Sequence, residues 1–216
     1  MGSDDSSWSP QTALSTLPHP PEENSTSPVA FFHLIERLKT TKREGWRRFG
    51  ISHGESISDH MYRMSIMTML APPELASKLN IPHCTKMALI HDMAESLVGD
   101  ITPADNVTKS EKARREGETM DYIVKTLLGN VPGGALSGAE IMRVFQEYED
   151  NQTPEAQFVH DIDKMELLLQ FIEYERTHGV DLQEFEYVAS KVQLPEIQAW
   201  AQQVISERPK YNKSDS

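Results

Sequence analysis

The chain has 216 residues, of which 38% are hydrophobic and 25% charged, a composition typical of one globular domain. Its formal net charge of −12 disfavours DNA and long RNA as partners, because both are polyanions. No apolar run approaches the ~18 residues that cross a bilayer, so no membrane segment is expected. A single cysteine, Cys84, excludes a disulfide framework within one chain and favours an intracellular, cytoplasmic protein.

The two ends of the chain differ in composition from the part between them. Residues 1–28 are rich in Ser, Thr, Pro and acidic residues, which predicts a disordered tail. Residues 209–216 predict a flexible C-terminus. Residues 29–208 are left as a single domain.

Nearly every segment of that domain shows a helical pattern, and no run shows the alternation of a strand. Capping signals mark several ends, among them Thr108 with Glu111, Ser137 with Glu140, and Thr153 before Pro154. The predicted helices are one stripe from Phe31 to Leu38, followed by 58–70, 85–98, 108–129, 137–149, 153–178, 181–192 and 195–207. The sequence therefore predicts an all-α fold of about eight helices.

Metal-binding side chains fall in three segments of these helices, where apolar residues are otherwise expected. His60 lies early in the second helix, His91 and Asp92 lie in the third, and Asp163 lies in the helix 153–178. On a continuous helix His91 and Asp92 diverge by about 100°, and Glu95 projects from the same face one turn later.

Burying such groups is costly unless a cation compensates their charge. Two imidazoles and two carboxylates suit octahedral Mn, Co or Fe, and Zn or Mg is also compatible. Each residue alone also has an ordinary structural explanation. Asp163 could pair with Lys164, and Asp100 could cap the turn before Ile101. Their joint order along a helical chain favours a divalent metal site.

Longer motifs around these residues resemble one known family. They are Ser58-Asp-His-Met-Tyr-Arg-Met64, Ala88-Leu-Ile-His-Asp-Met-Ala-Glu95, Val98-Gly-Asp-Ile-Thr-Pro-Ala-Asp-Asn106, Glu147-Tyr-Glu149 and Ile172-Glu-Tyr-Glu175. Over residues 30–207 the chain resembles the HD superfamily of metal-dependent phosphohydrolases. Within it, the motifs resemble the branch of HD domain-containing protein 2 and the bacterial YfbR-type 5′-deoxynucleotidases. The resemblance implies an HD-domain helical bundle.

The resemblance also implies roles for individual residues. The positions that match the family's metal ligands are His60, His91, Asp92 and Asp163. Glu95 matches a carboxylate that activates water or binds a second ion. Asp100 and the carbonyl of Ile101 match that second, catalytic site.

The resemblance also suggests candidate substrate-binding residues. Trp46 resembles an aromatic residue that closes the substrate pocket, and Glu147 matches an acidic residue near the sugar, with Glu149 as a competitor. The bacterial pattern has an arginine before the tryptophan, where this chain has Gly45. The candidates for binding phosphate are therefore Arg43, Arg47 and Arg48, with Lys109, Lys112, Arg114 and Arg115 as a second basic cluster. The alternative is a solvated basic loop with Trp46 in the core.

The function implied is a hydrolase of nucleotide metabolism, a metal-dependent 5′-deoxynucleotidase. It would convert nucleoside or deoxynucleoside 5′-monophosphates to nucleoside and phosphate, and the resemblance implies a homodimer. Two alternatives stay open. One is another HD phosphohydrolase acting on a cyclic nucleotide or a nucleotide pyrophosphate, and the other is a non-catalytic nucleotide-binding scaffold.

Overall fold

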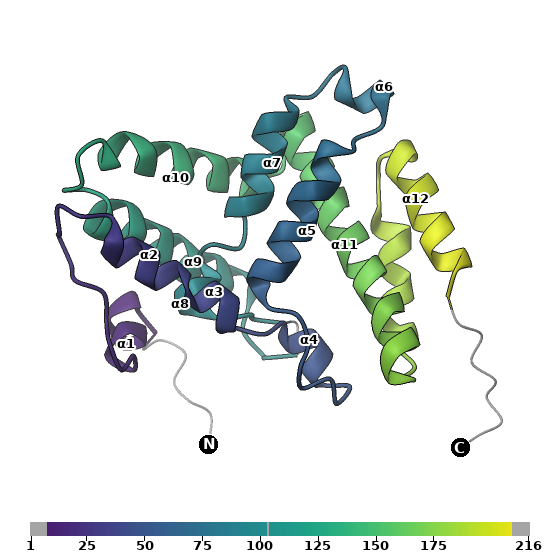
Figure 1. Ribbon diagram of the computed structural model, residues 1–216, viewed down its shortest axis with the longest axis horizontal. Helices are drawn as coiled ribbons and strands as arrows, with labels where there is room; N and C mark the ends of the chain where they lie inside the picture. Colours follow the sequence, from purple (N-terminus) through teal and green to yellow (C-terminus); the bar gives the residue numbers. More distant parts are fainter. Residues whose placement is uncertain (1–7, 103, 209–216) are drawn as a thin grey trace. The chain divides into compact units, whose positions relative to one another are not determined.

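A computed structural model describes residues 8–102 and 104–208, and these residues are mostly helical (Figure 1). Among them, extended pairing is confined to one isolated antiparallel bridge between Lys42 and Ser56. The predicted all-α fold class is therefore confirmed. No helix in the described ranges combines the length and apolarity needed to span a membrane. The predicted flexible C-terminus, 209–216, and residues 1–7 of the predicted tail lie outside the described residues.

The described residues group into two compact units. The first draws on residues 8–48, 52–61, 90–102 and 104–146, and the second on residues 49–51, 62–89 and 147–208. Helices of the first unit are α1 (Pro10–Ser15), α2 (Val29–Ile35), α3 (Arg37–Thr40), α4 (Glu44–Arg47), α8 (Glu95–Val98), α9 (Lys109–Tyr122) and the π-helix η2 (Ile123–Leu127). Helices of the second unit are α6 (Pro73–Ala76), α11 (Pro154–His178), the 3-10 helix η3 (Gln183–Lys191) and α12 (Pro195–Ser206). Three helices contribute residues to both units, namely α5 (Ile57–Met69), α7 (Ile81–Ile90) and α10 (Gly134–Asp150).

The described part of the predicted N-terminal tail, residues 8–28, contains the short helix α1. Ser9 and Thr12 form a reciprocal capping box at the start of α1, where Pro10 needs no amide partner. Helix α1 packs against α8 and α9, and Leu14 is buried. Burial of Leu14 offsets the conformational entropy lost on ordering, which the composition of the segment alone could not show.

The helix predicted over 85–98 is wrong in one respect that matters for the site. Helix α7 ends at Ile90, residues 91–94 form a turn, and α8 begins at Glu95. Backbone hydrogen bonds between residues three apart span this turn, from Met93 N to Ile90 O at 2.9 Å and from Glu95 N to Asp92 O at 3.0 Å. His91 and Asp92 therefore lie in a hydrogen-bonded turn between the two helices.

Other helix boundaries depart less from expectation. The stripe from Phe31 to Leu38 is divided between α2 and α3, and the short helix α4 lies in the segment between the first two predicted helices. Helix α10 begins at Gly134, so Ser137 does not cap it. Within the second unit, α12 and η3 both pack against the long helix α11 (Figure 1).

Candidate metal centre

His60 is placed by a cap at the start of α5. Ser56 Oγ accepts the Asp59 amide at 3.1 Å, and Asp59 Oδ2 accepts the Ser56 amide at 2.8 Å. This reciprocal cap fixes the first turn, in which His60 donates its amide to Ser56 O at 3.2 Å. The His60 side chain is fully buried. The spacing of Ser56 and Asp59 is a sequence signal for this helix start, and the sequence reading missed it.

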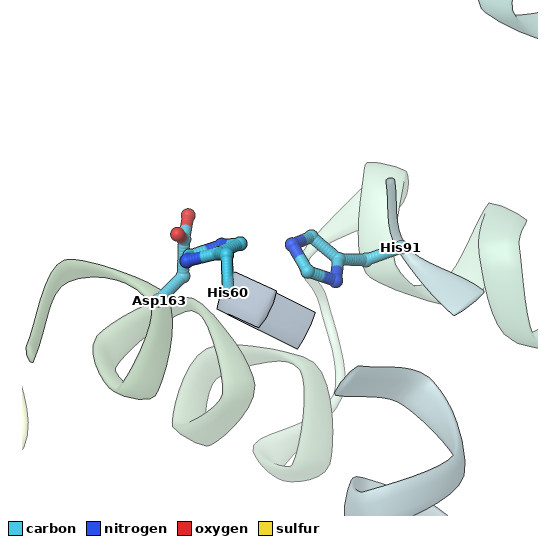
Figure 2. A group of neighbouring side chains, drawn as sticks. All are labelled: His60, His91 and Asp163. Carbon is cyan, nitrogen blue, oxygen red and sulfur yellow. The ribbon is translucent and has the colours of Figure 1, made fainter. Parts of the chain in front are cut away.

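The turn after α7 brings two more predicted ligands beside His60 within the first unit. Asp92 Oδ2 lies 3.2 Å from His91 Nε2 and 3.8 Å from His60 Nε2. The two imidazole rings have centroids 5.6 Å apart and planes inclined by 59°, and Figure 2 shows them side by side. One carboxylate oxygen thus faces two buried imidazoles.

Arg43 completes the charges around Asp92. Its Nη1 lies 3.3 Å from Asp92 Oδ2, and both side chains are mostly buried. The bridge between Lys42 and Ser56, with the bond from Arg43 N to Glu55 O, holds this part of the chain in place. Arg43, one of the three predicted phosphate-binding arginines, therefore contacts Asp92.

The other two arginines lie in more exposed positions. The Arg47 side chain is 58% exposed and donates to Glu44 Oε1 at 2.6 Å. Arg48 is also exposed.

The electrostatic surroundings of Asp92 keep it charged. Burial raises the pKa of its carboxyl, but His91, Arg43 and His60 together outweigh burial and hold the pKa well below its usual range. A deprotonated carboxylate beside imidazole nitrogens is the form that binds a cation.

Glu95 opens α8 with its side chain buried. Its Oε1 lies 3.9 Å from Lys112 Nζ, while its Oε2 has no hydrogen-bond partner among the described residues. Burial, followed by the charges of Asp92 and Asp100, raises the pKa of Glu95 well above its usual range. A buried carboxylate oxygen without a partner is costly, so this group fits a site that holds a cation or water.

Asp100 follows Gly99, the residue that ends α8. The φ of 77° at Gly99 is a left-handed conformation that favours glycine. Its Oδ2 accepts the amide of Glu44, the first residue of α4. Burial raises the pKa of Asp100, with Arg43 opposing the shift. Ile101, the predicted carbonyl ligand, is half-buried beside it.

The residues of the second basic cluster, Lys109 to Arg115, differ in their contacts. Arg114 and Arg115 both pair with Glu111, and Lys109 is exposed. Lys112 reaches Glu95 and also Glu116, at 3.5 Å.

Trp46 is buried, with 3% of its surface exposed, and donates Nε1–H to Glu55 Oε1 at 2.9 Å. In this structure its indole therefore packs within the first unit, as the core alternative expected. Its predicted role as the aromatic that closes the substrate pocket stays a prediction.

Asp163 lies on α11 in the second unit (Figure 2). Its Oδ2 accepts the hydroxyl of Tyr148 at 3.2 Å. Lys164 pairs instead with Asp161, at 3.0 Å. Asp161 also accepts the amides of Gln193 and Leu194, so it ties α11 to the start of α12.

Glu147 is also in the second unit, and both of its oxygens have partners. His83 Nε2 lies 2.8 Å from Oε2, and Thr153 Oγ1 donates to Oε1 at 2.8 Å. Its competitor Glu149 is exposed. The structure thus distinguishes the two glutamates by burial and leaves contact with a sugar as a prediction.

Comparisons with known proteins identify the family of the chain. A family model described as HD domain matches residues 35–200. The protein named 5′-deoxynucleotidase hdd1 of Schizosaccharomyces pombe is 46% identical over 190 residues, which are 87% of this chain and 93% of that protein.

Two solved structures share the fold. One is the HD domain-containing protein YGK1, with a TM-score of 0.63 and 30% identity, covering 93% of this chain and 97% of the other. The second is a predicted metal-dependent phosphohydrolase from Magnetospirillum magnetotacticum MS-1, with a TM-score of 0.61 and 26% identity, covering 83% and 89%.

Proposed function

The chain belongs to the HD domain family, and on that premise we propose that it is a metal-dependent hydrolase of nucleoside and deoxynucleoside 5′-monophosphates. Its products would be nucleoside and inorganic phosphate. Its relative from S. pombe carries the name 5′-deoxynucleotidase. The observation that carries the proposal is the convergence of His60, His91 and Arg43 on Asp92 in the first unit.

The proposed ligands of one divalent ion are His60, His91, Asp92 and Asp163. The first three fit a metal because two buried imidazoles face an ionised carboxylate. The inclusion of Asp163, from the second unit, is supported by its place in the order of family ligands. Mn, Co, Fe, Mg and Zn are all compatible with this donor set. When bound, such an ion polarises a phosphoryl oxygen and lowers the pKa of water.

Glu95 is proposed as the general base. Its partnerless Oε2 can accept a proton from the attacking water. Lys112, 3.9 Å from Oε1, keeps a positive charge beside this carboxylate. Asp100 and the Ile101 carbonyl are proposed to bind a second ion or to orient water.

Arg43 is proposed as the phosphate-binding arginine. Gly45 stands where the bacterial pattern has arginine. Arg43, two residues before Gly45, contacts Asp92 through its guanidinium. A guanidinium can make two parallel charge-assisted bonds to a phosphoryl group as its negative charge grows. Trp46 and Glu147 remain the proposed contacts to base and sugar.

The test is release of inorganic phosphate from a panel of nucleotides with Mn²⁺ or Co²⁺. The expected result is hydrolysis of nucleoside 5′-monophosphates that stops when a chelator is added. Asp163→Ala should lose both metal and activity, and Lys164→Ala, which removes a neighbour paired with Asp161, should keep both. Cleavage confined to cyclic nucleotides or pyrophosphates would reassign the substrate, and nucleotide binding without turnover would indicate a scaffold.

A further inference from the structure

Tyr148 is buried near the end of α10 and has two fixed contacts besides its hydroxyl. Its ring stacks on the imidazole of His160, with centroids 3.9 Å apart and planes 17° from parallel. The nitrogen Nε2 of that imidazole lies 2.9 Å from the Tyr148 carbonyl, which can only accept, so Nε2 carries the hydrogen. Tyr148 is thus held at both its ring and its backbone.

The hydroxyl of this restrained residue donates to Asp163 Oδ2 at 3.2 Å. His160 lies one turn before Asp163 on α11. His160, which stacks on Tyr148, and Asp163, which accepts the Tyr148 hydroxyl, therefore share one face of this helix. All three belong to the second unit. Rotation of the Asp163 side chain about its χ angles would break this partly buried hydrogen bond.

We propose that Tyr148 positions the carboxylate of Asp163 for the metal through its hydrogen bond to Oδ2. This inference rests on the proposed function, in which Asp163 is a ligand. Ligand carboxylates are oriented by outer hydrogen bonds, and loss of such a partner typically weakens metal binding by about 10- to 100-fold. Tyr148 is therefore a positioning residue, acting through Asp163 without touching the substrate.

The experiment measures the dissociation constant of Mn²⁺ by calorimetry, without substrate, for the full chain and its variants. Tyr148→Phe removes only the hydroxyl and keeps the ring that stacks on His160. We expect its Kd to rise about 10-fold or more. The matched control is Tyr174→Phe, for which we expect the parental Kd. Tyr174 is a buried tyrosine on α11, about 16 Å from Asp163 along the helix at 1.5 Å per residue.

A double-mutant cycle with Asp163→Asn separates positioning from a general structural effect. If Tyr148 acts through Asp163, adding Tyr148→Phe to Asp163→Asn changes the Kd by less than about twofold. Losses that multiply, or a parental Kd in Tyr148→Phe while Asp163→Asn binds weakly, overturn the inference and leave the proposed function standing. A parental Kd in Asp163→Asn removes Asp163 from the proposed ligands, and the inference fails with it.

Discussion

Arg43 offers the sharpest test of the phosphate site, because its role predicts two effects that differ in direction. Arg43→Gln removes the guanidinium whose Nη1 lies 3.3 Å from Asp92 Oδ2. If Arg43 binds the phosphoryl group, kcat/KM for a nucleoside 5′-monophosphate should fall. A hydrogen bond to a charged group contributes ~1.5–3 kcal/mol, which corresponds to a fall of roughly 10- to 150-fold.

The same substitution should not weaken metal binding. The guanidinium competes with a cation for Asp92 and repels it at short range, so its removal leaves the affinity for Mn²⁺ unchanged or raises it. The assay is therefore paired, with phosphate-release kinetics at saturating metal and a metal titration without substrate. Arg47→Gln is the control, because that side chain is 58% exposed and pairs with Glu44.

Two outcomes would refute this reasoning. Parental kinetics in Arg43→Gln would place phosphate binding elsewhere, with Lys112 as the next residue to replace because it reaches Glu95. Loss of metal and activity together would show that Arg43 serves to hold Asp92 in place.

Three further predictions concern the base, the thiol and the assembly. Glu95→Gln should keep the first metal while turnover falls by ~10²–10⁴ in phosphate-release assays, and unchanged turnover would make that carboxylate structural. Burial, reinforced by Glu155, raises the pKa of Cys84 to about 12, so at pH 8 the thiol is protonated. It should react with a disulfide reagent only after unfolding in urea, and rapid reaction of the native protein would contradict this. Sedimentation equilibrium should give twice the 24.5 kDa chain mass, as the family resemblance implies, whereas a monomer would contradict the homodimer.

Local signals in the sequence were enough for much of the fold. Thr153 and Pro154 start α11, and Gly179, with a φ of 66°, ends it where predicted, because caps act within one turn. Thr108 likewise accepts the amide of Glu111 at the start of α9. Motif order also predicted that His60 would lie near His91, although their segments are far apart in the sequence.

Features that depend on distant contacts could not be predicted in the same way. Apolar periodicity continues through 85–98, so it did not reveal the turn that contains His91 and Asp92. The contact of Arg43 with Asp92 is another such feature. The neighbouring Lys42 forms a bridge with Ser56, which pairs segments on either side of a loop.

The N-terminal segment follows the same rule. Its prolines and polar residues predict disorder, yet Leu14 finds a buried position against helices that lie about a hundred residues further along. Burial of a single side chain against another part of the chain has no signature in local composition.

The most direct test of the central claim is phosphate release from a deoxynucleoside 5′-monophosphate by the metal-depleted protein as Mn²⁺ is added back. The account predicts no turnover without metal, and turnover that rises and saturates with Mn²⁺ in the parent chain. It also predicts none at any Mn²⁺ concentration in His91→Ala, which removes a buried imidazole 3.2 Å from Asp92. Equal turnover with and without metal, or full turnover in His91→Ala, would contradict it.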